Sequence, residues 1–347
     1  MNTQTTVTHA HQQGAIRKII LAVIVIAVVI GALFYFNQTN KKPSISKPVT
    51  IAQFGDLLLY LPLYIAADEG LFTKHGLDVH ITSTGGDDKT YAAVISGSAD
   101  FGLADPTFVA IAQEKGQPGK VVALLINGMP NYGVALTPDK PVIKTPAELK
   151  GRTVATVPAP STSYALMKKL FERADLPPTI RQVAPPALVP TLQAGEADYA
   201  VLIEPWVSGV VQNGGHVAFS LTDYYPEFAL TGLTSNMKTI QQDPVKVENV
   251  VLALTEAVQI FYGDEERTLR VAVKHFPDEK PEQLKAGISR MRSDKIYPRV
   301  MTTGEKAWDT AIQLRVDTGD LTKPPQPITE YVDNSFAQKA AAAGSQH

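Results

Sequence analysis

Apolar and polar positions in Thr84–Ala112 fall into short blocks that predict alternating strands and helices. The preceding segment Val79–Thr84 has the pattern of a strand and ends at a pair of glycines. A helix follows, and Asp87 or Asp88 is its predicted N-cap, because a short carboxylate accepts hydrogen bonds from the free N–H groups of a first turn. Gly97 is expected to end this helix, since glycine readily adopts positive φ.

The next block repeats this arrangement. Ala99–Ala104 is short and apolar, as a strand buried on both faces is. Asp105-Pro106 is predicted to open a second helix, with an aspartate cap and a proline in the first turn. Both helices would begin just after the carboxyl ends of strands, at the edge where open parallel sheets bind ligands. We therefore predict one wall of a small-molecule cleft here; the alternative is an ordinary βαβ unit without a ligand.

The alternation continues on both sides of this stretch. Val49–Gly55 and Val121–Ile126 read as buried strands, and further short strands and helices lie between Thr137 and Pro226. This alternation of short strands and helices predicts an α/β fold with parallel or mixed sheets. From Pro244 onward the pattern is helical only, and the predicted helices are Val245–Tyr262, Glu266–His275, Pro281–Ser293 and Thr303–Thr318.

The late helices must cover a sheet that is already built, because no strand pattern remains to form a third one. The simplest arrangement makes the middle segment one lobe and joins the two flanks as the other, with extended crossings near Tyr132–Thr137 and Pro226–Thr234. Two crossings form a hinge, and a hinge between α/β lobes places a cleft between them. The predicted domains are lobe 1 at 49–136 plus 227–335, lobe 2 at 137–226, and a disordered tail at 336–347.

Composition narrows the classes of function. The 347 residues carry a formal net charge of −2, which gives no indication of a nucleic-acid partner. The chain has no cysteine, which excludes disulfides, thiolate catalysis and Cys-ligated metal sites. Its histidines are scattered, and the sequence contains no phosphate-loop, dinucleotide or G-x-S-x-G motif. We therefore expect a protein that is not an enzyme and that uses no cofactor or metal ion.

The N-terminal region predicts a membrane anchor. A polar tail at residues 1–18 ends in Arg17-Lys18, and residues 19–36 form an uncharged apolar run. A helix of this run would span about 27 Å, close to the thickness of a bilayer core. Small residues for cleavage are scarce, which favours an uncleaved single-pass signal anchor over a cleaved signal peptide. Residues 37–48 read as a linker, and the rest is expected on the periplasmic side of the inner membrane.

Several sequence pieces resemble the exported substrate-binding proteins of ABC importers, in the group for nitrate, sulfonates such as taurine, and thiamine-pyrimidine precursors. They are YIAADEGLF at 64–72, GLDV at 76–79, AVISGSADFG at 93–102, TPAELKG at 145–151 and LQAGEAD at 192–198. The similarity extends over about residues 49–335 and concerns fold and role rather than ligand. It implies a two-lobed, hinged type II periplasmic-binding-protein fold, acting as a monomer that delivers a small molecule to permease and ATPase subunits.

Candidate ligand contacts lie where strands end and helices begin in both lobes. In the second lobe these positions include a hydroxyl-rich helix start, where free N–H groups suit an anionic or carbonyl group. Each candidate also has a purely structural reading, as a helix cap or a core aromatic residue. The predicted ligand-binding residues are Phe54, Asp56, Gly86, Asp87, Asp88, Asp105, Thr107, Asn127, Tyr132, Ser161, Thr162, Ser163, Glu204 and Trp206.

The charges near the predicted cleft are mainly acidic, and Lys89 is the one basic residue within these turns. A site for a small anion such as nitrate is expected to bring a cation, so the pattern favours a neutral or amino-bearing ligand, such as an aminopyrimidine or another thiamine precursor. A sulfonate-like molecule stays open as the alternative. Glu204 is the most suggestive contact, because an unpaired charge at a buried strand end is costly. Two other functions stay open: a tethered sensor module that reports to a partner protein, and a pyrimidine-synthase-like enzyme.

Overall fold

The computed structural model describes residues 48–159, 161–322 and 326–344. The predicted tail 1–18, the predicted anchor 19–36 and nearly all of the linker 37–48 lie outside these ranges, so they stay predictions. Within the described ranges, no helix combines the length and apolar character needed to cross a membrane. The described residues belong to one compact unit, which contains two sheets.

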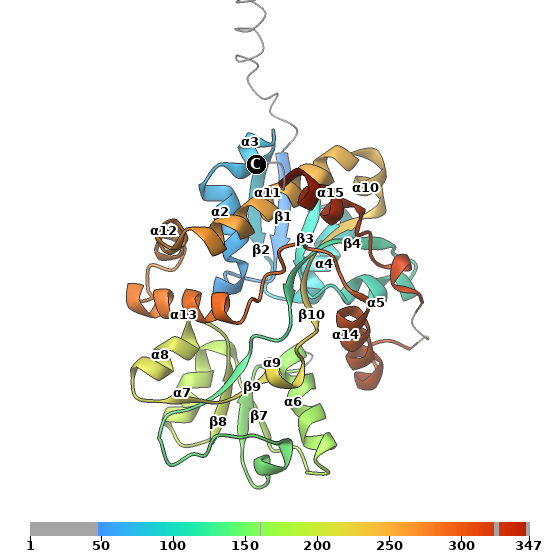
Figure 1. Ribbon diagram of the computed structural model, residues 1–347. Coiled ribbons are helices and arrows are strands. Elements are labelled where there is room, and N and C mark those ends of the chain that lie inside the picture. Colours follow the sequence, from blue (N-terminus) through green and yellow to red (C-terminus); the bar gives the residue numbers. More distant parts are fainter. Residues whose placement is uncertain (1–47, 160, 323–325, 345–347) are drawn as a thin grey trace, which may run out of the picture. The chain divides into compact units, whose positions relative to one another are not determined.

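The first sheet is mixed and is assembled from two distant parts of the chain (Figure 1). In spatial order its strands are β2 (Asp78–Ser83), β1 (Pro48–Gln53), β3 (Phe101–Ala104), β10 (Ala229–Asn236) and β4 (Gly119–Asn127). β1 pairs in parallel with β2 and β3, whereas β10 runs antiparallel between β3 and β4. The antiparallel strand therefore returns the chain to this sheet after the second sheet is complete.

The second sheet is also mixed. In spatial order its strands are β7 (Ile180–Gln182), β6 (Val154–Thr156), β8 (Tyr199–Leu202), β5 (Tyr132–Ala135) and β9 (His216–Ser220). β6 is parallel to β7 and β8, and β5 is antiparallel to β8 and β9. The two mixed sheets, each with its own helices, confirm the two-lobed α/β fold.

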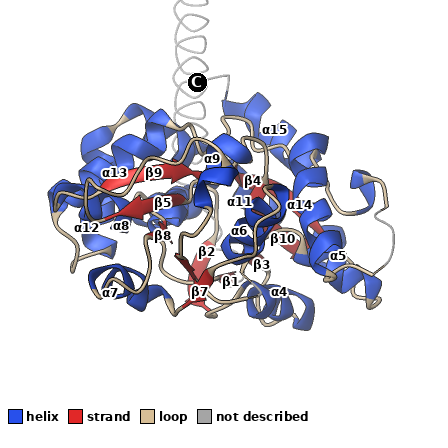
Figure 2. Cartoon of the chain, turned by 90° about the horizontal axis from the view of Figure 1, so that it is seen from below, coloured by secondary structure: helices blue, strands red, loops and turns tan. Residues whose placement is uncertain are grey.

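Helices cover both sheets (Figure 2). The helices α2 to α9 are Leu61–Asp68, Leu71–Lys74, Asp87–Ser96, Phe108–Glu114, Thr162–Arg173, Leu188–Gln193, Trp206–Gln212 and Leu221–Tyr224. The helices α10 to α15 are Met237–Gln242, Pro244–Gly263, Glu265–His275, Pro281–Ser293, Glu305–Thr318 and Ser335–Gly344. Four short 3-10 turns lie at Leu58–Tyr60, Pro146–Leu149, Pro185–Ala187 and Ile328–Glu330. The four helices predicted after Pro244 are confirmed as α11 to α14.

The largest apolar core lies between the first sheet and its helices. α11 packs against α2, α12 and α15, and its buried side chains Val250, Leu254 and Phe261 share one cluster with Ile51 of β1. A smaller cluster in the second sheet includes Val134 of β5 and Ala200 and Leu202 of β8. These cores fix the strand ends from which the site is built.

The predicted disordered tail at 336–347 is wrong for the residues that the structure describes. Residues 335–344 form α15, and Phe336, Ala337 and Ala340 are buried in the first core. Small alanine side chains let α15 lie close to α11 and β4. A run of alanines that looks uninformative in sequence is thus a packed helix face.

The two predicted extended crossings are both strands. Tyr132–Ala135 is β5 and belongs to the second sheet, although the sequence places residues up to 136 in lobe 1. Its pairing with β9 depends on Gly133, because a Cβ there would lie 2.1 Å from the ring of Phe219. The segment Ala229–Asn236 is β10 of the first sheet.

Two of the predicted aspartate caps have other partners. The extended residue before α4 is Gly86, and the helix begins at Asp87, whose carboxylate turns to the backbone of Asp105 instead. α5 begins only at Phe108, and Asp105 accepts from the N–H of Thr107 in a turn before it. The predicted stop at Gly97 is confirmed, with a φ of 78°.

Candidate functional site

A cavity of about 160 Å³ lies between the loops that follow strands of the two sheets. The first sheet contributes Phe54, which follows β1, and Asp105, which follows β3; the second sheet contributes the start of α6 and the residues after β8. Strand ends of this kind are where open α/β sheets place ligands. The lining residues are Phe54, Leu57, Leu59, Tyr60, Asp87, Asp105, Met129, Asn131, Val157, Ser161, Thr162, Ser163, Pro185, Leu188, Val201, Leu202, Ile203, Trp206, Leu230 and Thr231.

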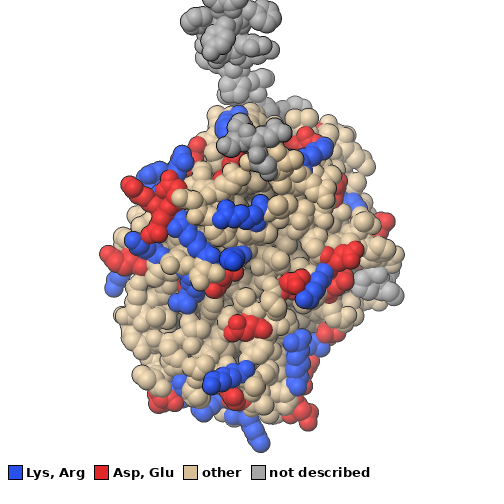
Figure 3. Space-filling model, in the orientation of Figure 1, with Lys and Arg blue, Asp and Glu red and all other residues tan. Residues whose placement is uncertain are grey.

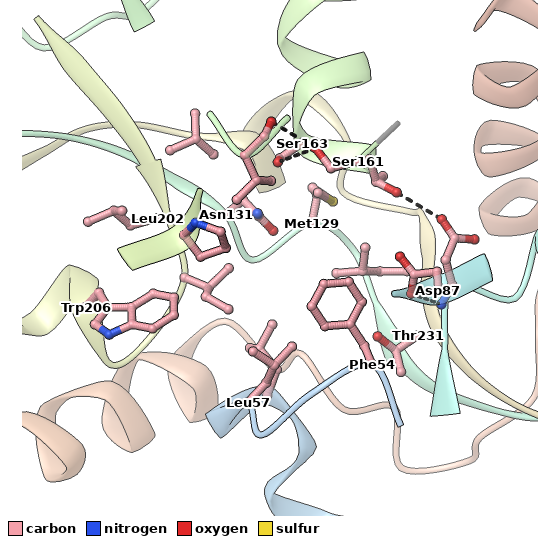
Figure 4. A pocket seen from close by; sticks show the side chains of 18 of the residues that line it. Phe54, Leu57, Asp87, Met129, Asn131, Ser161, Ser163, Leu202, Trp206 and Thr231 are labelled. Carbon is pink, nitrogen blue, oxygen red and sulfur yellow. Dashed lines mark hydrogen bonds between the residues drawn. The ribbon is translucent and has the colours of Figure 1, made fainter. Parts of the chain in front are cut away.

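Most of the cavity wall is apolar. Trp206 and Leu202 lie on one side of the pocket, and Phe54 lies on the other (Figure 4). Such a wall suits the flat faces of a small ring, because aromatic side chains pair favourably in stacked or edge-on arrangements. Asn131 adds an amide group to the wall, so the apolar region has a polar edge.

Asp105 forms the centre of a buried hydrogen-bond network at the polar end of the cavity. Its Oδ1 accepts from the hydroxyl of Thr107 at 2.5 Å, and its Oδ2 accepts from the hydroxyl of Thr162 at 2.9 Å. The guanidinium of Arg315 donates to the same Oδ2 at 2.6 Å. Thr162 opens α6 of the second sheet, so this network connects the two sides of the cavity.

Arg315 reaches this network from α14, far along the chain. The residue is 2% exposed, and it also donates to Thr107 at 3.0 Å and to Asp320 at 3.2 Å. Burial alone would lower the pKa of Arg315, but the carboxylate of Asp105 holds it above its usual value. The positive charge of Arg315 is thus balanced by Asp105 and Asp320, and Arg315 itself does not line the cavity.

Asp87 is the second carboxylate that lines the cavity. It is half-buried, and one of its oxygens accepts from the backbone N–H of Asp105 at 2.9 Å. Burial, reinforced by the neighbouring charge of Asp105, raises the pKa of Asp87 to about 7. Burial and the nearby carboxylate of Asp87 also raise the pKa of Tyr60, whose phenol stays protonated at neutral pH. The polar end therefore combines a carboxyl group that is about half ionised at pH 7 with a hydroxyl donor.

The pKa of Asp87 predicts a characteristic dependence of stability on pH. Between about pH 4 and pH 7 the folded chain holds a proton on Asp87 that the unfolded chain has lost, so this group's contribution to stability falls as the pH rises. We expect urea unfolding at pH 5, 6 and 7 to show a smaller loss of stability for Asp87→Asn than for the parent chain. Identical pH slopes for the two proteins would contradict the assigned environment.

Half of the predicted ligand-binding residues line this cavity. They are Phe54, Asp87, Asp105, Ser161, Thr162, Ser163 and Trp206. Ser161 is also the N-cap of α6, as predicted, and accepts from the N–H of Tyr164 at 3.3 Å. A structural cap and a place in the cavity wall are therefore compatible, and ligand contact by these residues stays a prediction.

The other predicted residues lie elsewhere. Asp56 is exposed and accepts from Gln53 and Ser83, and Asp88 is exposed on α4. Asn127 accepts from the N–H of Phe228. The remaining positions outside the lining are Gly86, Thr107, Tyr132 and Glu204.

Glu204 differs most from its predicted role. The side chain is 1% exposed and does not line the cavity. Its carboxylate accepts from the hydroxyl and the N–H of Ser208, both at 3.1 Å, and from Arg290 at 2.7 Å. The sequence correctly indicates a costly buried charge, but its partner is an arginine of α13 rather than a ligand.

Sequence reasoning missed several residues of the site. Tyr60, Asn131 and Thr231 line the cavity from loops and from a strand whose faces the pattern leaves ambiguous. Arg315 has a readable signal: it follows Ala307 and Ala311 at helical spacing and so lies on the apolar face of α14. An arginine on an apolar helix face is rarely buried without a carboxylate partner.

Two further features of the described residues concern metal binding and surface charge. They contain no group of three or more His, Asp or Glu side chains placed to hold a metal ion. On the face shown in Figure 3, cationic and anionic side chains are interspersed rather than gathered into a patch of one sign.

Comparison with known proteins identifies relatives of the whole binding unit. A putative binding protein of Bacillus subtilis, YtlA, is 22% identical over 326 residues, which are 89% of this chain and 94% of the relative. A solved structure from Bordetella bronchiseptica has a TM-score of 0.70 at 21% identity and covers 86% of this chain and 98% of its own. The alkanesulfonate-binding protein of Xanthomonas axonopodis, solved with MOPS, has a TM-score of 0.63 at 16% identity and covers 85% and 98%.

The solved structures support the fold, and a family match shows to which protein family the chain belongs. The family described as NMT1/THI5 like matches residues 59–267, more than half of the chain. This range includes most of the cavity wall, from Leu59 to Thr231. The chain therefore belongs to the NMT1/THI5-like family of ABC substrate-binding proteins, with the two-lobed type II periplasmic-binding-protein fold.

Proposed function

We propose that this protein captures a small organic molecule with an amino group, an aminopyrimidine in the first instance, and delivers it to an ABC permease. Asp87 carries the proposal, because it is a cavity carboxylate whose charge no cation of the lining balances. No Lys, Arg or His is among the described residues that line the cavity. A sulfonate or nitrate would meet the negative charge of Asp87 without such a partner.

The rest of the cavity supports a flat, partly apolar ligand. Phe54 and Trp206 offer aromatic faces, while Asn131, Ser161 and Ser163 provide donors and acceptors for ring substituents. The cavity volume of about 160 Å³ suits a single small ring rather than an extended chain. The amino N–H of an aminopyrimidine would donate to the ionised carboxylate of Asp87, and such a charge-assisted hydrogen bond is stronger than a neutral one.

A thermal-shift and calorimetric comparison of the purified chain tests this proposal. The probes are 4-aminopyrimidine and its substituted forms, pyrimidine itself as the matched ligand without the amino group, and methanesulfonate and nitrate as anions. At a hundredfold excess over Kd a binder stabilises the chain by about 2.7 kcal/mol. We expect this for aminopyrimidines alone; binding of the anions without binding of any aminopyrimidine would refute the ligand class.

The proposal includes two organisational features. Lobe 1 would comprise 49–136 and 227–335, and lobe 2 would comprise 137–226, a division that the membership of both sheets supports except at β5. Residues 19–36 would tether the binding unit to the inner membrane on its periplasmic side, as their uncharged apolar run favours. Alkaline extraction of membranes that contain the full chain would leave a tethered protein in the pellet and release an untethered one.

A further inference from the structure

Helix α13 has two faces that contact different parts of the molecule. Its apolar face carries Leu284, Ile288 and Met291, which are buried in the core of the first sheet together with α11. Neighbouring α12 packs beside it (Figure 1). Packing of this kind makes α13 part of the first sheet's rigid body.

A second side of α13 lies about 100° around the helix from the apolar face and is mainly polar. It bonds to residues of the second sheet's loops and strands. Gln283, Gly287, Arg290 and Asp294 follow one another at intervals of four, three and four residues, which places them along one side of the helix. We name these four residues the α13 stripe. α13 lies beside α8 of the second sheet along this side.

Gln283, Gly287 and Arg290 of the α13 stripe contact the Glu204-Pro205 segment. Gln283 donates to the carbonyl of Pro205 at 3.0 Å, and Arg290 donates to Glu204 at 2.7 Å. Gly287 supplies the space that this approach needs, since a Cβ there would lie 3.0 Å from the Glu204 carboxylate. Glu204 is thus a fully buried carboxylate whose one cationic partner, among the described residues, belongs to α13.

Arg290 and Asp294 of the α13 stripe also contact Tyr132 of β5. Asp294 accepts a short hydrogen bond from the phenol of Tyr132, and the guanidinium of Arg290 lies 5.6 Å from the centre of the Tyr132 ring. Burial raises the pKa of Tyr132 above its usual range, so the phenol remains a donor. Both contacts join α13 to β5 of the second sheet.

These contacts lie directly behind the cavity. Glu204 and Pro205 stand between Ile203 and Trp206, and both of those residues line it. Ile203 packs against the core of the first sheet and Trp206 against that of the second, and the segment that the α13 stripe holds lies between them in the chain. Release of Glu204 would move one cavity wall as a unit with α8.

We propose that the α13 stripe is a latch that holds the two lobes together before any ligand arrives and positions Trp206 for binding. The latch rests on the division into two lobes that is part of the proposed function, and on a hinge between them that lets the lobes open and close. Removal of one partner of a buried ion pair leaves an uncompensated charge, which strongly disfavours the arrangement that buries it. Opening lets water reach Glu204, so loss of Arg290 favours the open form.

Distance measurements on the ligand-free full chain test the latch. The chain has no cysteine, so spin labels can be placed cleanly at Val142→Cys and Val245→Cys, whose parent side chains are 54% and 59% exposed. Val142 follows β5 of the second sheet, and Val245 lies at the start of α11 on the first. Double electron–electron resonance then reports the populations of closed and open lobes without any ligand.

We expect the parent chain to show a short-distance population, and Arg290→Met to reduce it about tenfold relative to the long-distance population. Asp294→Asn, which keeps the side-chain shape, should shift it in the same direction to a smaller extent. Lys285→Met is the matched control on α13, because its ion pair with Glu265 lies on the surface. That control should leave the distribution unchanged.

Each outcome decides the matter. The latch would be overturned by a parent chain without a short-distance population, or by Arg290→Met and Asp294→Asn distributions that match the parent. Circular dichroism identifies a variant that fails to fold, and Asp294→Asn then decides in place of Arg290→Met. Since no ligand is added, failure of the latch is distinguishable from failure of the proposed ligand class, which only the binding measurements address.

Discussion

Arg315→Met should lower the free energy of unfolding by about 3–5 kcal/mol, the largest effect that we expect from a single substitution. The guanidinium bonds to Asp105, Thr107, Thr162 and Asp320 within a region that water hardly reaches. Methionine preserves most of the side-chain volume but leaves the Asp105 carboxylate buried without its cation. Urea denaturation of the parent and the variant at pH 7 measures the difference.

Lys306→Met provides the matched control on the same helix. Lys306 pairs with Glu227 at the surface, and such pairs contribute about 1 kcal/mol or less. In the double variant Asp105→Asn with Arg315→Met, the buried charge is absent and part of the lost stability should return. Equal losses for Arg315→Met and Lys306→Met would show that the buried network is not the source of the effect.

Asp87→Asn should weaken the binding of an aminopyrimidine about 10- to 100-fold, because a hydrogen bond to a charged group is worth about 1.5–3 kcal/mol. The amide has nearly the same shape, so the cavity wall is preserved while the charge is removed. Stability at pH 7 should not fall, since the ionised carboxylate is the form that burial disfavours. Isothermal titration calorimetry at pH 7 gives the ratio of the two dissociation constants.

Asp88→Asn is the control for this second substitution. Asp88 carries the same charge one residue along α4, but it is exposed and does not line the cavity. Binding should change by less than about twofold, because solvent and salt screen an exposed charge. If both variants weaken binding equally, the general negative potential around α4, and not a contact with Asp87, determines the affinity.

The two substitutions separate two roles of charge in one site. Arg315 neutralises the charge of Asp105 and so stabilises the folded state at the polar end of the cavity. Asp87 has no such cation among the described residues that line the cavity and can contact a ligand at the cavity surface. A cation that is already bound to two carboxylates has little attraction left for an anionic ligand. The structure therefore strengthens the ligand class that the acidic turns indicate, although it brings an arginine close to them.

Local chemistry explains the parts of the fold that the sequence predicts well. The helices after Pro244 follow from apolar spacing, and Asp243 caps α11 by accepting from the N–H of Lys246, as an aspartate before Pro244 should. Ser161 caps α6 in the same manner. These features involve residues within four positions of one another, so the amino-acid order alone is sufficient to indicate them.

Packing explains where sequence reasoning fails. Gly86 rather than an aspartate precedes α4, because the Asp87 carboxylate finds the backbone of Asp105, a residue of the next turn in space. The alanines of α15 form a helix because α11 covers them, and not because the run itself signals one. In each case a residue or helix that is distant in sequence provides the contact that stabilises the observed local conformation.

The sequence by itself determined the α/β class, the helical C-terminal part, the resemblance to a binding-protein family and seven of the twenty residues that line the cavity. Only the tertiary structure decided the partners of the charges. Arg315 meets Asp105 across 210 positions, and Arg290 meets Glu204 across 86. The physical reason is that a buried charge must be paired, but the pattern of one segment does not say which distant segment will bring the opposite charge.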